Sequence, residues 1–228
     1  GLLSMKSGGR TAEVVARLKD EQAIRRSRVH PVAVLSALMT YQQGKGVKGG
    51  NTWPVSAPVV DALDAAFYLA FGNVVPTGKR IMLALDVSGS MASGEIAGVP
   101  GLTPRVASAA MALVTLRTEP NMITVAFTAP SSASRLGITE LPLSARQRLD
   151  DVVKQITALP FERTDCALPA LYAAEQKLEI DAIVILTDNE TWAGNVHPFQ
   201  ALNKYRQQSG IATKQVVVGM TATAFTIA

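Results

Sequence analysis

The stretch KRIMLALDVSGSM, residues 79–91, decides the fold class of this chain. Its apolar part, IMLAL at 81–85, has no alternating polar positions, which predicts a strand buried on both faces. Its second part, DVSGSM at 86–91, places an acid and two serines directly after that strand. A strand covered on both faces belongs to a sheet between two layers of helices. The stretch therefore predicts an α/β protein with polar side chains gathered at a strand end.

From this stretch to the C-terminus, apolar runs alternate with amphipathic segments. Strands are expected at residues 79–86, 122–128, 181–188 and 214–220, with a weaker edge strand at 135–141 and a last strand at 225–228. Helices are expected at residues 104–119, 144–159, 165–179 and 197–210. Ser144 and Gln147 stand three residues apart, as in a capping box that opens the second of these helices. The alternation predicts a doubly wound, mostly parallel sheet of the Rossmann-like type.

The N-terminal third shows helical patterning and no strand pattern. Apolar residues recur at helical spacing within residues 14–18, 30–41 and 56–71, so about three helices are expected. Between the last two lies QQGKGVKGGNTWP, residues 42–54, whose four glycines and one proline cannot continue a helix. The chain is therefore expected to divide into an all-α segment, residues 1–76, and an α/β domain, residues 77–228.

The bulk composition is that of a chain able to bury a core. It has 228 residues, of which 48% are hydrophobic and 18% charged. No run of eighteen apolar residues occurs, and the first residues lack a secretory signal, so we expect no membrane contact and a cytoplasmic location. Cys166 is the single cysteine, which excludes an internal disulfide and a cysteine-based zinc site. The net charge of +4 permits a nucleic-acid partner without identifying one.

Side chains with oxygen atoms stand at three loops of the expected sheet. Asp86, Ser88 and Ser90 follow the strand at 79–86. Asp188 ends the strand at 181–188, and Thr164 opens the helix that precedes this strand. Ligands of such sheets bind where loops leave the carboxyl ends of the strands. All three loops are therefore expected to present oxygen atoms at one rim of the sheet.

Two catalytic interpretations of DVSGSM fit poorly. A serine-hydrolase elbow needs a glycine two residues before the serine, where Asp86 stands, and a histidine relay, for which only His30 and His197 exist. A phosphate-binding loop would use Gly78-Lys79, but Arg80 replaces the required Ser or Thr, and the motif precedes its strand. Neither chemistry has its full set of residues in this sequence.

The same residues suit a hard divalent cation. Mg²⁺ prefers oxygen ligands in octahedral geometry and keeps several waters. Ser88 and Ser90, two residues apart on a tight loop, can both point to one ion, and Thr164 can join them from the second loop. Asp86 and Asp188 would act mainly through waters and hydrogen bonds, which leaves one position open for an acidic group of a partner. The residues therefore predict a divalent-cation site, most readily for Mg²⁺.

Two resemblances extend this interpretation. The pattern Asp86-x-Ser88-x-Ser90, followed by Thr164 and Asp188, resembles the metal-ion-dependent adhesion site (MIDAS) of von Willebrand factor A domains. From about Arg25 to the C-terminus, the chain also resembles the Ro autoantigen family and its bacterial members, in the stretches TWP, PTGKR, LDVSGSM, RTE, TDCALP, TDNETWAG, VHP, ALNKYR, GMT and FTIA. By this resemblance the all-α segment is the end of a ring of helical repeats, and the α/β part is an A domain, truncated if FTIA is a strand cut off before its closing helix.

The Ro resemblance implies a function in RNA binding. Members of that family bind small structured Y RNAs on the outside of the ring and the ends of misfolded RNAs in its central hole. We therefore expect a protein without catalytic activity that binds non-coding RNA. Its cation would receive an acidic group, for example from an RNA-processing protein. Two alternatives remain: a protein-interaction A domain without RNA contact, and a metal-assisted phosphate hydrolase that uses Asp86 and Asp188.

Two further features of the sequence bear on these expectations. Lys45 and Lys48, in the glycine-rich loop, are candidate phosphate contacts, with a solvated loop as the alternative explanation. Trp53, at the end of that loop, can stack on a base or pack inside the protein. Glu162 and Arg163 precede Thr164 where the family favours Gly-Gly, and the carboxylate of Glu162 can compete for the cation. Thr164 is therefore the least constrained of the five expected site residues.

Overall fold

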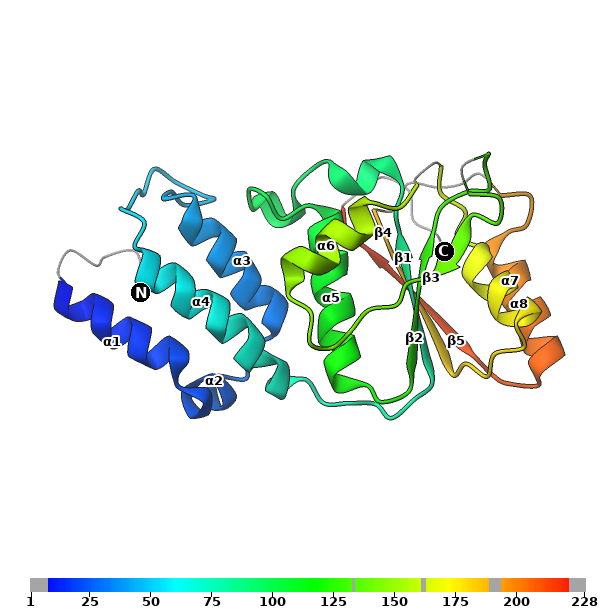
Figure 1. The fold of residues 1–228 in the computed structure, drawn as a ribbon, viewed down its shortest axis with the longest axis horizontal. Helices are drawn as coiled ribbons and strands as arrows, with labels where there is room; N and C mark the ends of the chain where they lie inside the picture. Colours follow the sequence, from blue (N-terminus) through cyan, green and yellow to red (C-terminus); the bar gives the residue numbers. More distant parts are fainter. Residues whose placement is uncertain (1–7, 133, 161–162, 189–193, 222–228) are drawn as a thin grey trace. The chain divides into compact units, whose positions relative to one another are not determined.

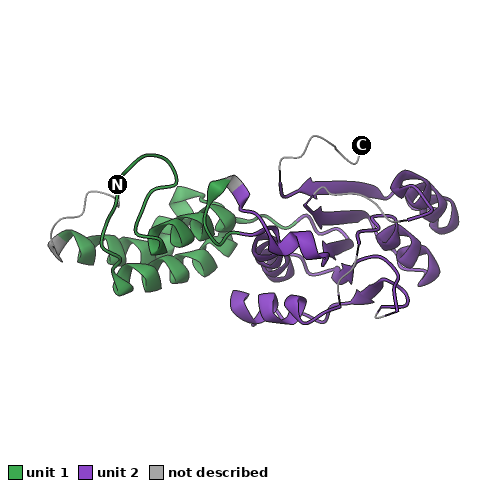
Figure 2. Cartoon of the chain, turned by 90° about the horizontal axis from the view of Figure 1, so that it is seen from above, with its two compact units in different colours: residues 1–76, 97–102 green, residues 77–96, 103–228 purple. Residues whose placement is uncertain are grey.

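The protein has two compact units. The computed structural model describes residues 8–132, 134–160, 163–188 and 194–221. Unit 1 comprises the residues before Thr77 together with Ala97–Leu102, and unit 2 comprises Thr77–Ile96 and the residues from Thr103 onward (Figure 2). Within the described ranges, no helix combines the length and apolar character needed to cross a bilayer.

The helices of unit 1 differ in number from the sequence prediction. Its described residues form α1 (Gly8–Lys19), α2 (Glu21–Ser27), α3 (Pro31–Gln42), α4 (Ala57–Leu69) and the 3₁₀ turn η2 (Ala70–Asn73). The expectation of about three helices is wrong, because Asp20 separates α1 from α2. Its carboxylate accepts hydrogen bonds from the main-chain N–H groups of Gln22, at 2.9 Å, and Ala23, at 3.2 Å. An aspartate in this position caps a new helix.

The core of unit 1 is built around α4. This helix packs against both α1 and α3, as the ribbon shows (Figure 1). Its buried face carries Val59, Leu63 and Phe67, which are nearly inaccessible to solvent. Phe67 also makes an edge-to-face contact with Phe71 of η2, at a ring separation of 5.0 Å. Burial of such side chains, at about 1.5–3 kcal/mol each, holds the helices together.

Unit 2 contains the expected mostly parallel sheet. Among the described residues, its strands are β1 (Ile81–Asp86), β2 (Met122–Phe127), β3 (Ile138–Glu140), β4 (Ala182–Thr187) and β5 (Lys214–Gly219). They lie in the order β3-β2-β1-β4-β5, and only β3, at one edge, runs antiparallel to its neighbour. The predicted α/β class and the weak edge strand are confirmed, and the strand expected at 225–228 lies outside the described residues.

Helices cover both faces of this sheet. The described helices of unit 2 are α5 (Pro104–Thr118), α6 (Leu149–Thr157), α7 (Leu168–Glu175) and α8 (Pro198–Ser209), with the short 3₁₀ turn η3 (Gly89–Ala92). A further 3₁₀ turn, η4 (Ile96–Gly98), begins in unit 2 and continues into unit 1. The sheet separates α5 and α6 from α7 and α8 (Figure 1). All six residues of β1 are buried, as the apolar run IMLAL predicts. Helix α8 ends as expected at Gly210, whose φ of 71° is the left-handed conformation that glycine adopts easily.

The second helix of unit 2 begins later than the sequence predicts. Helix α6 starts at Leu149 and not at Ser144, because the predicted capping box closes a separate turn. The Gln147 side chain accepts from the Ser144 N–H at 2.7 Å, as in a capping box. The Ser144 hydroxyl, however, accepts from the N–H of Arg146 at 3.2 Å. Ser144 also accepts from the N–H of Gln147 through its main-chain carbonyl, at 3.0 Å, so these residues close a local turn, and the helical conformation begins only at Leu149.

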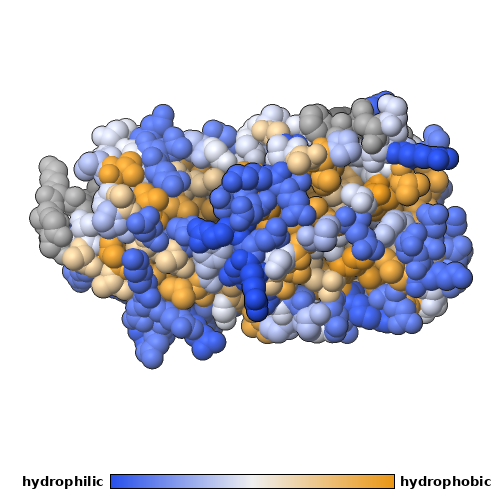
Figure 3. Space-filling model, viewed as in Figure 1, coloured by the Kyte–Doolittle hydropathy of each residue, from blue (hydrophilic) through white to orange (hydrophobic). Residues whose placement is uncertain are grey.

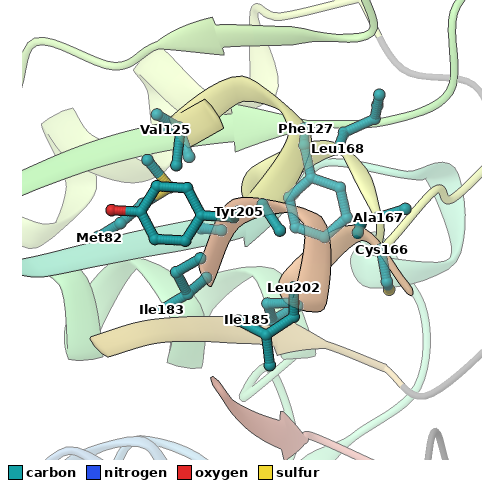
Figure 4. Packing of buried hydrophobic residues seen from close by; sticks show 14 of the residues in the cluster. Met82, Val125, Phe127, Cys166, Ala167, Leu168, Ile183, Ile185, Leu202 and Tyr205 are labelled. Carbon is teal, nitrogen blue, oxygen red and sulfur yellow. The ribbon is translucent and has the colours of Figure 1, made fainter. Parts of the chain in front are cut away.

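One hydrophobic core cluster of unit 2 lies between the sheet and the pair α7 and α8. Figure 4 shows Met82, Phe127 and Ile185 of the sheet packed with Leu202 and Tyr205 of α8. The buried Tyr205 hydroxyl donates to the carbonyl of Leu178 at 2.6 Å and accepts from the N–H of Ile180 at 2.9 Å. These contacts fix the turn that leads from α7 into β4, and with it the position at which β4 ends.

The outer surface is of mixed character. On the face drawn in Figure 3, hydrophobic residues lie among hydrophilic ones over both units. The most exposed of the large apolar side chains are Val75, Leu136 and Phe199, which are well separated in sequence. Single exposed apolar residues are ordinary on protein surfaces. The buried polar groups of unit 2 are therefore the more distinctive feature of this chain.

Candidate metal centre

The Asp86 carboxylate joins three segments of the chain at the carboxyl ends of β1 and β4. Its Oδ1 accepts from the N–H of Ser88 at 2.8 Å. Its Oδ2 accepts from the hydroxyls of Thr164, at 3.2 Å, and Thr187, at 2.7 Å. Asp86 is only 1% exposed, so these donors replace water around it. The structure thus brings the first loop, the segment before α7 and the end of β4 together at one carboxylate.

The two serines of the first loop lie side by side. Ser88 follows β1 closely, and Gly89 opens the 3₁₀ turn η3 that carries Ser90. This turn brings the hydroxyls of Ser88 and Ser90 to 3.2 Å, at which distance they share a hydrogen bond. Ser88 is buried and Ser90 is partly exposed. Two hydroxyl oxygens therefore stand next to the Asp86 network, one of them open to solvent.

Asp188 is the second buried carboxylate of this region. It follows β4 directly, and β4 is the immediate neighbour of β1 in the sheet. Its main-chain carbonyl accepts a hydrogen bond from the Thr221 hydroxyl. Burial raises the pKa of Asp86, the hydrogen bonds from Ser88 and Thr187 counteract this, and the negative charge of Asp188 raises it further. Two buried carboxylates that repel one another favour a nearby positive charge.

Part of that charge comes from Arg105, in the first turn of α5. Its guanidinium Nη2 donates to the carbonyl of Ser88 at 3.2 Å, which ties the first loop to the helix. Burial lowers the pKa of Arg105, and the negative charge of Asp86 opposes this shift. Arg105 therefore both supports the loop and partly balances the carboxylates.

Three residues in or directly beside this network were not singled out from the sequence. They are Arg105, Thr187 and Asp165, all of which are buried. Thr187 directly precedes Asp188, so its position at a strand end was an available signal. No pattern in the sequence pointed to Arg105, because its contact with Ser88 spans 17 positions and depends on how α5 packs.

Arg163, directly before Thr164, is anchored through its main chain at a position where the family favours glycine. The main-chain carbonyl of Arg163 accepts from the Thr128 hydroxyl, just beyond β2, at 2.9 Å. Thr164 is 5% exposed and donates to Asp86. Glu162, the expected competitor for the cation, lies outside the described residues. Thr164 is thus held on two sides, by its own hydroxyl and by the preceding peptide.

The set of donor atoms fits a hard divalent cation. Hydroxyl oxygens of Ser88, Ser90 and Thr164 and carboxylate oxygens of Asp86 and Asp188 are of the kind that Mg²⁺ prefers. In the part of the chain that the structure describes, no group of three His, Cys, Asp or Glu residues is arranged to hold a metal. A cation here would therefore depend on hydroxyl ligands, with the carboxylates balancing its charge.

Lys45 and Lys48 belong to unit 1 and not to the Asp86 network, which lies in unit 2. Both are exposed on the loop between α3 and α4. An antiparallel bridge between Lys45 and Thr52 narrows the base of this loop. Trp53 donates its indole N–H to the Tyr41 carbonyl at 3.0 Å and stacks on the Tyr41 ring at 6.0 Å. Trp53 therefore anchors the loop that presents the lysines.

Comparisons with known proteins agree with this architecture. A family model described as the Ro60 vWA domain matches residues 80–228. The RNA-binding protein RO60 of Deinococcus radiodurans is 49% identical over 228 residues, which is 100% of this chain and 42% of that protein. The RNA-binding protein RO60 of Caenorhabditis elegans is 44% identical over 209 residues, which is 92% of this chain and 31% of that protein.

A solved structure is similar along the whole chain. The crystal structure of the Deinococcus radiodurans RO (RSR) protein superposes with a TM-score of 0.89 at 47% sequence identity. The match covers 100% of this chain and 45% of that one. The chain thus spans less than half the length of the relatives that it matches.

Proposed function

Because this chain belongs to the Ro60 family, we propose that it is part of a Ro-like RNA-binding protein whose A domain carries a divalent-cation site. The RNA role is supported by two relatives, both named as RNA-binding proteins, that are 49% and 44% identical to the chain. The cation site is supported by the buried Asp86 network in unit 2. In this proposal, unit 1 contributes phosphate contacts with RNA, and unit 2 contributes the cation site.

The RNA ligands in this proposal are small structured non-coding RNAs, such as Y RNAs, and misfolded RNAs. Exposed lysines give an affinity for the phosphate backbone that depends on salt and not on sequence. Lys45 and Lys48 offer such contacts from an anchored loop, so less conformational entropy is lost when they bind. Base recognition would come from other residues of the full-length protein.

One observation carries the proposed cation site: a single buried carboxylate accepts hydrogen bonds from three chain segments, beside two adjacent serine hydroxyls. Ser88, Ser90 and Thr164 would supply direct hydroxyl ligands, and Asp86 and Asp188 would act through water. A bound Mg²⁺ supplies an electrophilic position for an anionic oxygen of a partner. Ser90 is partly exposed, which leaves access for such a group.

The partner in this proposal is a protein that presents an acidic side chain, for example an RNA-processing protein. The network favours binding over catalysis, because both oxygens of Asp86 already accept hydrogen bonds. A carboxylate engaged in this way is a weak general base. We therefore propose that this region has no catalytic activity.

Calorimetric titration with Mg²⁺ and Mn²⁺ tests the cation site. The wild-type protein should bind one ion, and the Ser88→Ala/Ser90→Ala double variant should bind it at least about tenfold more weakly, because two ligands are lost. Ser132→Ala is the matched control, since this serine is exposed on the loop after β2 and should leave the affinity unchanged. The proposal is wrong if the wild type binds no ion, or if the double variant binds as well as the wild type.

Filter binding of a structured non-coding RNA to the full-length protein tests the RNA role. Raising the salt concentration from about 50 to 200 mM should weaken binding on the order of 10²-fold if about four phosphates are contacted. Absence of binding at low salt would favour the alternative of an A domain that contacts protein only. Hydrolysis of a phosphate ester that is lost in Asp86→Asn would instead indicate the hydrolase.

A further inference from the structure

Asp165 and Gly194 make an unusually close contact beside the Asp86 network. A Cβ atom at Gly194 would lie 2.5 Å from Oδ1 of Asp165 and 2.6 Å from both its Cγ and its Oδ2. Real Cβ atoms do not approach other heavy atoms so closely, so no residue with a side chain fits at 194 without moving the carboxylate. The carboxylate of Asp165 therefore lies directly against the glycine backbone.

The carboxylate of Asp165 is fixed from its other side. Its Oδ1 accepts from the N–H of Ala167 at 3.0 Å, in the turn that leads into α7. Asp165 is 6% exposed, so it is enclosed by protein. A buried group held by a hydrogen bond and by close packing has little freedom to move aside.

This contact links one segment of the proposed cation site, the one that carries Thr164, to the residues that lead into α8. Asp165 directly follows Thr164, whose hydroxyl donates to Asp86. Gly194 lies six positions after Asp188 and four before Pro198, where α8 begins. The residues just before α8 therefore meet the Thr164 segment at this contact.

We propose that Asp165 is a positioning residue and that Gly194 is its counterpart. Their contact holds the Thr164 segment against the residues that lead into α8, and so keeps Thr164 in place beside Asp86 for the cation. The contact acts through shape: the flat carboxylate fits against a residue without a side chain. This inference deepens the proposed function and rests on it for the link to cation affinity.

The first test compares the Mn²⁺ affinity of four variants by calorimetry. Gly194→Ala should weaken binding by about tenfold, as changes around metal ligands typically do. Asp165→Asn keeps the shape and the acceptor for Ala167, so it should stay within about threefold of the wild type. Gly50→Ala is the matched control, because a Cβ at Gly50 meets no atom within 4 Å.

The fourth variant, Gly194→Ala/Asp165→Ser, tests for rescue. Serine is shorter than aspartate but still accepts a hydrogen bond from an N–H two residues ahead. It should make room for the new methyl group and recover most of the affinity that Gly194→Ala loses. Recovery by a substitution at Asp165 would show that the loss arises from this contact, because residues in contact couple energetically.

Hydrogen exchange without metal separates this inference from the proposed function. In EDTA, Gly194→Ala should speed amide exchange at 163–168 and 194–197, and the double variant should restore slow exchange. If the wild type binds no cation but this exchange pattern appears, the cation site is wrong and the contact still holds the two segments. The inference is overturned if Gly194→Ala changes neither affinity nor exchange, or if Asp165→Asn is as damaging as Gly194→Ala.

Discussion

At the scale of single residues, Asp86 shows how a strand end gathers hydrogen-bond donors from several chain segments. The last residue of a parallel strand points its polar groups toward the loops at the carboxyl edge of the sheet. Asp86 uses this position to accept from Ser88, Thr164 and Thr187. Its charge is buried, so each lost donor should be costly. The stability of the site therefore depends on neutral hydroxyls as much as on carboxylates.

Thr187→Val should lower the free energy of unfolding by about 1–3 kcal/mol, because it removes a buried donor to a carboxylate while keeping the side-chain shape. Urea denaturation in EDTA measures this change without any contribution from a bound metal. Thr157→Val is the control: its hydroxyl is exposed on α6, and its loss should change the stability by less than about 0.5 kcal/mol. A Thr187→Val protein as stable as the wild type would contradict the importance of this donor.

Cys166 should react very slowly with thiol reagents in the folded protein. It is 2% exposed, and burial together with the negative charge of Asp86 raises its pKa from 9.0 to about 12. At pH 8 this shift lowers the thiolate fraction on the order of 10³-fold, so labelling should be at least about 100-fold slower than in urea. Mass spectrometry of maleimide-treated protein measures the rate directly, since this is the single cysteine. Rapid labelling of the folded protein would show that the segment before α7 opens readily.

At the scale of elements, an ion pair fixes where two central strands begin. Arg80, just before β1, donates from Nε and Nη2 to the two carboxylate oxygens of Asp181, just before β4, at 3.1 and 2.7 Å. Its main-chain N–H also donates to Asp181, at 2.9 Å. Glu179 adds a second carboxylate to the Arg80 guanidinium. These contacts align the starts of β1 and β4, and through the strands they align the ends that carry Asp86 and Asp188.

The pH dependence of stability should report this ion pair. Hydrogen bonds from Arg80 lower the pKa of Asp181 from 3.8 to about 2. Between these two values the unfolded chain binds more protons than the folded protein, so the stabilisation is complete above pH 3.8 and is lost as the pH falls toward 2. Urea unfolding of wild type and Asp181→Asn from pH 2 to 5 should give a stability difference that grows with pH up to about 4. If the stability difference between wild type and Asp181→Asn does not change with pH over this range, the ion pair does not lower the pKa of Asp181. The effect should be modest, because the pair is partly exposed.

At the scale of the whole molecule, the two units carry different chemistry. Unit 2 buries its functional groups at the carboxyl ends of its strands, whereas unit 1 presents lysines on an exposed loop. A family of proteins that bind RNA can use such a division, because phosphate contacts need solvent-exposed cations and a cation site needs enclosed oxygens.

Lys45→Ala/Lys48→Ala should make RNA binding by the full-length protein less sensitive to salt. Each phosphate contact contributes about 0.9 to the slope of log affinity against log salt on duplex nucleic acid, and about 0.7 on single strands. The double variant should therefore reduce the slope by roughly 1.4–1.8, as measured by filter binding. Lys204→Ala/Lys214→Ala, two exposed lysines of unit 2, is the matched control. An unchanged slope in the first variant would place the phosphate contacts elsewhere.

The sequence by itself determined the fold class, the family and the location of the candidate site. Local sequence patterns are sufficient to predict the fold class and the location of the candidate site. An unbroken apolar run such as IMLAL indicates a strand buried on both faces, and DVSGSM after it indicates polar side chains at the end of that strand. The predicted helix boundaries were less accurate: Ser144 closes a turn where a helix start was predicted, and Asp20 caps a helix that was not predicted. The same kind of side chain can close a turn or cap a helix, and the packing of neighbouring residues selects between these outcomes.

Only the tertiary structure decided how the site is supported. The donor Thr187, the guanidinium of Arg105 and the contact between Asp165 and Gly194 join residues that lie between 17 and 101 positions apart. Sequence patterns report the surroundings of a residue along its own strand or helix, but they do not show which segments meet at the rim of a sheet. The register of β1 against β4 and the packing of α5 and α7 fix those meetings. The candidate ligand residues could therefore be proposed from the sequence, whereas the residues that support them could be identified only in the structure.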